Sequence, residues 1–217
     1  MTDLLVLHDV GAPGGSAWSA AFARWSGRVL APDLPGHGGT PPPVGGHYET
    51  GDAVFAALDL LRTETPDELV IVGVGHNGAA AQILALGGRA AGLVLVDGLG
   101  GPWLGPVEID ERQREMRRRI LTTPGAMSEP APGAADPRAT MVVRAADRGF
   151  AVRQAEAMPV PVLLIETPSS ATPDADELVN HFAQATLTHL DAVDPGQAAS
   201  IVGAWWVAHA RRAGQQH

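Results

Sequence analysis

The stretch LVIVGVGHNGAA at residues 69–80 decides the fold of this chain. Its first part, Leu69 to Val72, is a continuous apolar run of strand length, and a glycine-rich turn follows it. Alanines come after the turn, which predicts a helix over Gly78–Leu86. A strand, a tight turn and a helix in this order form the arrangement that holds one catalytic side chain above a parallel sheet.

Further apolar runs alternate with helix-like segments along the chain, and this alternation predicts a parallel α/β sheet. The runs lack polar alternation, as is typical of strands covered by helices on both faces of a three-layer α/β/α sandwich. We expect strands at Leu4–Leu7, Arg28–Ala31, Leu69–Val72, Leu93–Val96, Val160–Ile165 and Thr186–Leu190. We expect helices at Ser16–Ser26, Gly51–Arg62, Gly78–Leu86, Pro173–Gln184 and Pro195–Ala213. With the strands numbered along the chain, the expected order in the sheet is 2-1-3-4-5-6.

The regular alternation stops between Gly98 and Met158. Two helix-like segments, Glu108–Leu121 and Arg138–Ala157, flank a stretch rich in proline, glycine and alanine. Because this insertion separates two strands of one sheet, we interpret residues 98–158 as a short cap or lid within a single domain spanning 1–217. Trp103 is predicted to lie near the mouth of the pocket beneath it.

Composition limits the possible functions. The chain contains no cysteine, which excludes disulfides and thiolate chemistry, and its 15 basic residues are all arginine, which excludes a lysine Schiff base. Its net charge of −9 argues against nucleic acids and anionic membranes as partners. We expect a cytoplasmic protein of bacterial composition, since we see neither a signal peptide nor an apolar run of about 18 residues. We also expect no metal, because no cluster of His, Asp or Glu has metal-ligand spacing. We expect no cofactor, because the GxGxxG pattern of residues 73–78 is a weak nucleotide signal by itself.

Four stretches together resemble the α/β-hydrolase superfamily. Leu4–Trp18 looks like the first strand and oxyanion loop, and Arg28–Thr40 is very close to the family's Asp-x-Pro-Gly-His-Gly turn. Leu69–Ala81 looks like the nucleophile elbow, and Ala91–Gly98 looks like the strand that follows it. The resemblance implies an α/β-hydrolase core without its usual N-terminal hairpin, in which His37 and Asp33 belong to a structural turn.

The resemblance leaves three registers for the nucleophile position. Aligning Gly75-His76 with the family's Gly-His places Asn77 there, which is the register we favour. Aligning Gly78 with the last glycine of the motif places His76 there instead, and aligning from Gly73 places Gly75 there. No register supplies serine, cysteine or aspartate, and an amide is a poor nucleophile.

The partners of a nucleophile are also altered. The family's histidine follows the last strand, but here the nearest candidate is His189, within the predicted strand itself. Asp174 and Asp97 follow strands where the family places its acid, although helix capping or turn formation explains both equally well.

The loop after the first strand departs from the family pattern as well. His8 is followed by Asp9, where the resemblance implies glycine. The N–H of Val10 could still point into the pocket, but a carboxylate there opposes stabilisation of an oxyanion. If Asp9 faces the pocket, it could act as a base or bind a cationic or hydroxyl group; if it faces solvent, it has no such role.

These observations support three hypotheses about function. The first is a hydrolase-like protein that lacks the Ser-His-Asp machinery and binds a small, mostly apolar or ester-like molecule. The second is an enzyme with unconventional roles for Asn77, His76, Asp9 or His189, acting as a lyase, isomerase, cyclase or unusual hydrolase. The third is an interaction protein with a vestigial pocket. The oligomeric state and the pathway are left open.

Overall fold

The computed structural model describes residues 1–12, 14–43, 48–99, 102–124, 136, 138–139, 146–168, 170 and 175–214. Six parallel strands form the central sheet, in the order β2-β1-β3-β4-β7-β8. The strands are β1 (Asp3–Leu7), β2 (Val29–Leu30), β3 (Leu69–Val74), β4 (Gly92–Val96), β7 (Val162–Glu166) and β8 (Ala185–His189). The predicted strand order is therefore confirmed.

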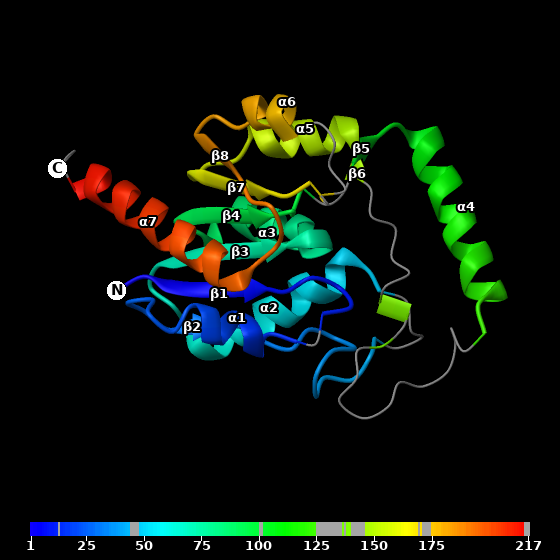
Figure 1. Cartoon of the computed structure of the whole chain (residues 1–217), viewed down its shortest axis with the longest axis horizontal. Helices are drawn as coiled ribbons and strands as arrows, with labels where there is room; N and C mark the ends of the chain where they lie inside the picture. Colours follow the sequence, from blue (N-terminus) through cyan, green and yellow to red (C-terminus); the bar gives the residue numbers. More distant parts are fainter. Residues whose placement is uncertain are drawn as a thin grey trace.

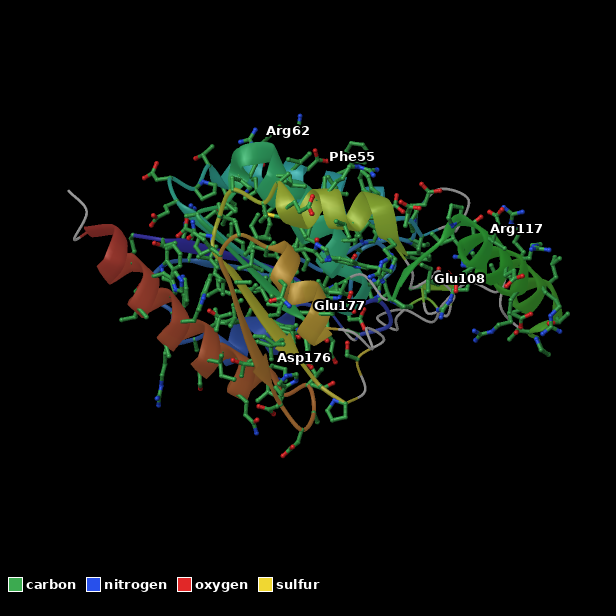
Figure 2. All side chains as sticks on the ribbon, turned by 90° about the horizontal axis from the view of Figure 1, so that it is seen from above. Phe55, Arg62, Glu108, Arg117, Asp176 and Glu177 are labelled. Atoms are coloured by element: carbon green, nitrogen blue, oxygen red, sulfur yellow. The ribbon has the colours of Figure 1, made fainter. Side chains whose placement is uncertain are left out.

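Helices cover both faces of the sheet (Figure 1). On one face, α1 (Ser16–Ala21) and α7 (Pro195–Gly214) pack on the side chains of Leu4 and Val6 and their neighbours in the other strands. On the other face, four helices pack on the side chains of Leu5 and Leu7 and on their neighbours in the other strands. These helices are α2 (Thr50–Glu64), α3 (Gly78–Leu84), α5 (Arg148–Glu156) and α6 (Ala175–Leu178). Figure 2 shows Phe55 and Arg62 on α2 at one side of the molecule and α7 at the other. Because both faces are buried, the strands are apolar throughout, which confirms the three-layer architecture.

Several predicted helices are shorter than the sequence suggests. The helix expected over Pro173–Gln184 is α6, followed by a 3-10 turn, η4 (Val179–His181). The helix expected over Arg138–Ala157 begins at Arg148, because the Asp147 side chain accepts a hydrogen bond from the Phe150 N–H and caps it. After α3 the chain continues in a π-helical turn, η2 (Ala85–Arg89), whose Gly88 has a left-handed backbone.

Part of the inserted segment stands apart from this core. Its helix α4 (Pro106–Thr122) has no buried side chain, and Figure 2 shows it, with Glu108 and Arg117, projecting away from the sheet. Two short parallel strands, β5 (Trp103–Leu104) and β6 (Ala146–Asp147), form a separate small sheet. That the segment acts as a lid stays a prediction. No helix in the described part of the chain is long and apolar enough to cross a membrane.

The inserted segment is also tied to the core at Asp136. The N–H of Asp136 donates to the carbonyl oxygen of Gly36 at 2.8 Å, and the Tyr48 hydroxyl donates to the Asp136 carboxylate at 2.8 Å. Arg138 completes a buried ion pair with the same carboxylate. Burial by itself raises the pKa of Asp136, but the bonds from Arg138 and Tyr48 together outweigh it and lower the pKa. This contact joins the insertion to the turn at residues 33–40, beside the elbow.

Candidate functional site

The elbow after β3 contains one residue with a left-handed backbone, Gly75, whose φ is +55°. The following turn, η1 (Gly75–Asn77), leads into α3, and Asn77 has an ordinary φ of −76° and ψ of 0°.

A Cβ atom added at Gly73 would lie 2.6 Å from the Cβ of Ala81, and one added at Gly78 would overlap the carbonyl oxygen of Gly98. The glycines at 73 and 78 thus allow close packing of strand and helix. Gly75 is the residue of this turn with a left-handed backbone, and a strained conformation is typical of the residue that carries the nucleophile in an elbow of this type.

The carboxylate of Asp9 lies directly over this turn. Its Oδ1 accepts hydrogen bonds from the N–H of Val10 and the N–H of His76, both at 2.8 Å. A Cβ atom added at Gly75 would overlap the Asp9 carboxylate. Asp9, which is half-buried, therefore lies over the elbow, and its carboxylate takes the space that a side chain at Gly75 would need.

The two N–H groups that hold Asp9 have a defined place in this architecture. An oxyanion hole is built from the N–H of the residue after the nucleophile and an N–H of the loop after an early strand. With Gly75 at the strained position, these donors are His76 and Val10. They already bind a negative charge supplied by the chain itself, in charge-assisted hydrogen bonds.

Asn77 has a structural contact in this arrangement. Its side chain is only 3% exposed, and its Nδ2 donates to the carbonyl oxygen of His8 at 2.6 Å. Asn77 and His76 line a small cavity with Val10, Leu34 and other residues, and its volume is about 20 Å³. A cavity of this size holds about one water molecule.

His8 and His37 support the loops around the site. The N–H of Leu34 donates to His8 Nε2 at 3.1 Å, so His8 Nδ1 carries the proton and lies 3.0 Å from the Asp9 carbonyl oxygen. Burial lowers the pKa of His8, which keeps the ring neutral. His37 Nε2 accepts from the N–H of Gly11 at 2.8 Å in the same way. Both rings therefore fasten the β1 loop to the turn at residues 33–40.

The remaining predicted site residues lie elsewhere. The His189 side chain, on the edge strand β8, is 59% exposed, and its Nε2 lies 3.5 Å from Asp176 on α6. Trp103 is buried in β5, donates to the Leu99 carbonyl oxygen at 3.0 Å and packs beside the ring of His181. Asp174 lies outside the described residues. No contact in the described part of the chain brings His189 or Trp103 to the elbow.

Two further acids lie at the carboxyl ends of neighbouring strands. Asp97 follows β4, and its carboxylate accepts from the N–H of Thr167 at 2.7 Å and from the Thr167 hydroxyl at 2.6 Å. Burial raises the pKa of Asp97; the Thr167 bonds oppose this and the charge of Asp9 adds to it. Glu166 ends β7, and burial raises its pKa to about 7. Glu166 was not among the site residues predicted from the sequence, although a carboxylate that ends the apolar run VLLIE is a visible signal.

Among the described residues, no group of three or more His, Cys, Asp or Glu side chains could hold a metal ion. The site thus combines a strained glycine, a carboxylate bound by a pair of N–H groups, and two neighbouring acids, the half-buried Asp97 and the buried Glu166.

The comparisons with known proteins concern the family and the fold. Residues 4–213 match the model of the Alpha/beta hydrolase family. Over 85 residues the chain is 39% identical to a pimeloyl-(acyl-carrier protein) methyl ester esterase of Aromatoleum aromaticum, a match that covers 38% of this chain and 31% of that protein. The enol-lactonase of Burkholderia xenovorans has a TM-score of 0.68 at 21% identity, covering 93% of this chain and 90% of that one.

A thioesterase domain from the curacin biosynthetic pathway is similar to the same extent. Its TM-score is 0.66 at 19% identity, with 94% of this chain and 89% of that one covered. Likeness at this level of identity shows the fold alone, whereas the family model spans nearly the whole sequence. The chain therefore belongs to the α/β-hydrolase family.

Proposed function

We propose that this protein is a member of the α/β-hydrolase family without hydrolytic activity, and that its site binds a small molecule instead. One observation carries the proposal: the Asp9 carboxylate accepts hydrogen bonds from the N–H groups of Val10 and His76, over the left-handed turn at Gly75. Of the three registers that the sequence leaves open, this geometry favours Gly75. Neither Asn77 nor His76 then acts as a nucleophile.

The chemistry of ester hydrolysis explains why these features matter. An acyl-transfer site needs a nucleophile activated by a base within about 2.6–3.2 Å. It also needs free donors for the developing oxyanion, and loss of one such donor lowers kcat by about 10² to 10³. Here Asp9 engages both donors. A substrate carbonyl would have to displace a carboxylate from its charge-assisted hydrogen bonds before reaction could begin.

The same arrangement defines the ligand we propose. Asp9 repels carboxylates and other anions from the position where the family stabilises an oxyanion, and Asp97 adds a second acid nearby. Apolar side chains, among them Val10, Leu34 and Ala53, lie beside the elbow. We therefore propose a neutral or cationic, mostly apolar ligand with a hydroxyl or amine group that donates to the Asp9 carboxylate. Because the cavity beside the elbow has room for about one water molecule, the loops around it must move apart to admit such a ligand.

An enzyme with unconventional chemistry is the alternative, and the position of Asp9 favours it specifically. A carboxylate placed where the fold carries its nucleophile could transfer a proton to or from a bound molecule. A lyase or isomerase of this kind would lose its activity in Asp9→Asn, because an amide keeps the shape of the side chain but cannot take up a proton.

Hydrolysis of p-nitrophenyl acetate and butyrate tests the proposal. We expect no turnover above the buffer rate and no labelling of any serine by a fluorophosphonate probe. Stoichiometric labelling, or turnover that persists through purification and disappears in Asp9→Asn, would refute it.

Ligand class can be tested with probes of equal chain length. We expect octylamine or octanol to raise the melting temperature and octanoate to have no effect. Asp9→Asn should weaken the response to octylamine most, while Asp67→Asn, which changes an exposed acid, serves as the matched control. Equal responses to all three probes in the wild type would contradict a role for Asp9 in ligand choice.

A further inference from the structure

The helix α4 receives little support from the described part of its own chain. None of its side chains is buried, and Figure 2 shows it projecting from the sheet and the helices that cover the sheet. Its apolar residues are not among those that pack against the two described core clusters. Because helices in proteins gain most of their stability from a packed apolar face, α4 becomes more stable when a partner covers such a face.

One stripe along α4 can form that face. Its four residues are half-buried, whereas every other residue of the helix is exposed: Ile109, Gln113, Met116 and Ile120. Their spacings of four, three and four residues are those of the a and d positions of a coiled coil. A seam this narrow fits against a second helix rather than against a broad apolar surface.

The stripe is complementary to a reversed copy of itself. Its spacings are the same when read in either direction along the helix. In an antiparallel pair of α4 helices, Ile109 therefore lies opposite the partner's Ile120, and Gln113 lies opposite the partner's Met116. The same contacts form twice, on the two sides of a two-fold axis, as in a closed symmetric dimer.

Charge along α4 favours the same orientation. Acids predominate in its first half and arginines in its second half: Glu108, Asp110 and Glu111 come first, and Arg112, Arg114, Arg117, Arg118 and Arg119 follow. A parallel pair would bring like charges together. An antiparallel pair brings the acidic half of each helix to the basic half of the other.

The two flanks of the stripe also fit this pairing. Asp110 and Arg117 lie on one flank, seven residues apart, and neither side chain has a polar partner in the described part of the chain. An antiparallel second copy places the partner's Arg117 beside Asp110. On the other flank two glutamates alternate with two arginines, at positions 108, 112, 115 and 119, so that flank also presents both signs of charge.

We propose that two copies of this chain associate through α4, with the two helices antiparallel about a two-fold axis. The occupant is a second copy because the seam and the charges are complementary to themselves, a property that an unrelated partner does not require. Each helix is about 25 Å long, so the contact is at the small end of specific interfaces and the dimer should dissociate at micromolar concentrations. The inference does not depend on what the site at the elbow binds.

Sedimentation velocity of the full chain, from about 1 to about 500 μM, tests the association. We expect the wild type to pass from monomer to dimer over this range. Met116→Glu should raise the dissociation constant at least about 100-fold, because it places an unpaired charge in the seam twice. Val107→Glu makes a similar change at a residue that is 70% exposed and lies off the stripe, and should leave the constant unchanged. A wild type that stays monomeric throughout would overturn the proposal, including one that binds phosphatidylglycerol vesicles instead.

Introduced cysteines test the orientation, since the natural chain has none. We expect Ile109→Cys combined with Ile120→Cys to give a disulfide-linked dimer under mild oxidation. Each single variant should remain unlinked, because identical positions in the antiparallel pair are about 16 Å apart along the helix axis. Efficient linkage in the single variants would indicate a parallel pair and overturn the orientation.

Charge reversal tests the flank without altering the stripe. Asp110→Arg and Arg117→Asp should each raise the dissociation constant by about threefold to tenfold, because each brings like charges together twice. The double variant restores opposite charges across the pair and should recover most of the affinity. Weakening that is additive in the double variant, rather than reversed, would contradict the proposed register.

Discussion

Two turns at the carboxyl edge of the sheet differ in which of the residues implied by the family resemblance they contain. In the turn at residues 33–40, Asp33 and His37 have the identities that the family resemblance implies, and both serve the backbone. Asp33 accepts from the N–H of Gly15 at 2.9 Å and from the N–H of Gly39 at 3.3 Å. In the elbow at residues 73–78, the close glycine packing is kept, but no reactive side chain stands at the strained position.

The difference separates two kinds of constraint. Groups that satisfy buried backbone N–H and C=O groups, or allow strand and helix to touch, are required for folding whatever the protein does. A nucleophile, in contrast, contributes to reaction rather than to stability, and functional positions are often strained. A chain that no longer catalyses a reaction is therefore expected to keep the residues that folding requires and to lose the residues that only the reaction requires. Each prediction below tests that separation, starting with the largest expected effect.

Gly78→Val should have the largest effect. Its side chain would overlap the backbone of Gly98, which cannot move without separating β4 from the elbow. We expect a loss of about 3 kcal/mol or more in the free energy of unfolding, measured by urea denaturation. Gly39→Ala, where nothing lies within 4 Å of an added Cβ, is the control and should change stability by less than about 0.5 kcal/mol. A well-folded Gly78→Val would show that the close packing is not required.

Gly75→Ser should be destabilising for a different reason. The new side chain meets the Asp9 carboxylate and also takes a left-handed backbone conformation, which together should cost about 2–3 kcal/mol. Asp9→Gly in the same chain removes the overlap, so the double variant should be more stable than Gly75→Ser alone. Strictly additive effects of the two substitutions in urea denaturation would mean that Asp9 does not occupy this space. Neither variant should hydrolyse p-nitrophenyl esters, because no base has been supplied.

Asp33→Ala should have an intermediate effect. Removal of the carboxylate leaves the N–H groups of Gly15 and Gly39 without their acceptor, at a cost of about 1–3 kcal/mol. Asp67→Ala is the matched control at an exposed position. Urea denaturation of both variants measures the difference. A neutral Asp33→Ala would remove the basis for treating the two turns as different.

The smallest expected effect is the pH dependence caused by His8. Burial lowers its pKa in the folded state, so below the ordinary value of 6.5 the unfolded chain binds more protons than the folded one. Stability should therefore fall as the pH drops below 6.5. Melting curves between pH 7.5 and pH 5 should show a smaller slope for His8→Gln than for the wild type. An equal slope would mean that folding does not lower the pKa of His8.

Much of the architecture was readable from local sequence. The apolar runs and the glycine-rich turn predicted the parallel sheet, its strand order and its helical layers, and the structure confirms them. Helix ends were less predictable, since the start of α5 depends on the Asp147 cap and α6 gives way to a 3-10 turn. Such ends are set by a few hydrogen bonds rather than by hydrophobic periodicity.

The candidate site could be predicted only in part from the sequence. The replacement of glycine by Asp9 stood out in the sequence, but its consequence did not, because the carboxylate meets a backbone N–H 67 positions away. The choice among Asn77, His76 and Gly75 also depends on backbone geometry. Three candidate positions lie within three residues of each other, and only the φ angles distinguish the strained one.

By itself, the sequence determined the fold, because the length and spacing of hydrophobic segments reflect burial that every strand and helix must achieve locally. It also determined that serine, cysteine and aspartate are missing from all three registers of the elbow. The sequence also predicted that β1 lies beside β3, but only the tertiary structure decided that the Asp9 carboxylate reaches the N–H groups over Gly75. The same adjacency of β4 and β7 couples Asp97 to Thr167 next to Glu166. Contacts of this kind depend on strands that pair across long stretches of chain, and no local pattern records which side chains will meet there.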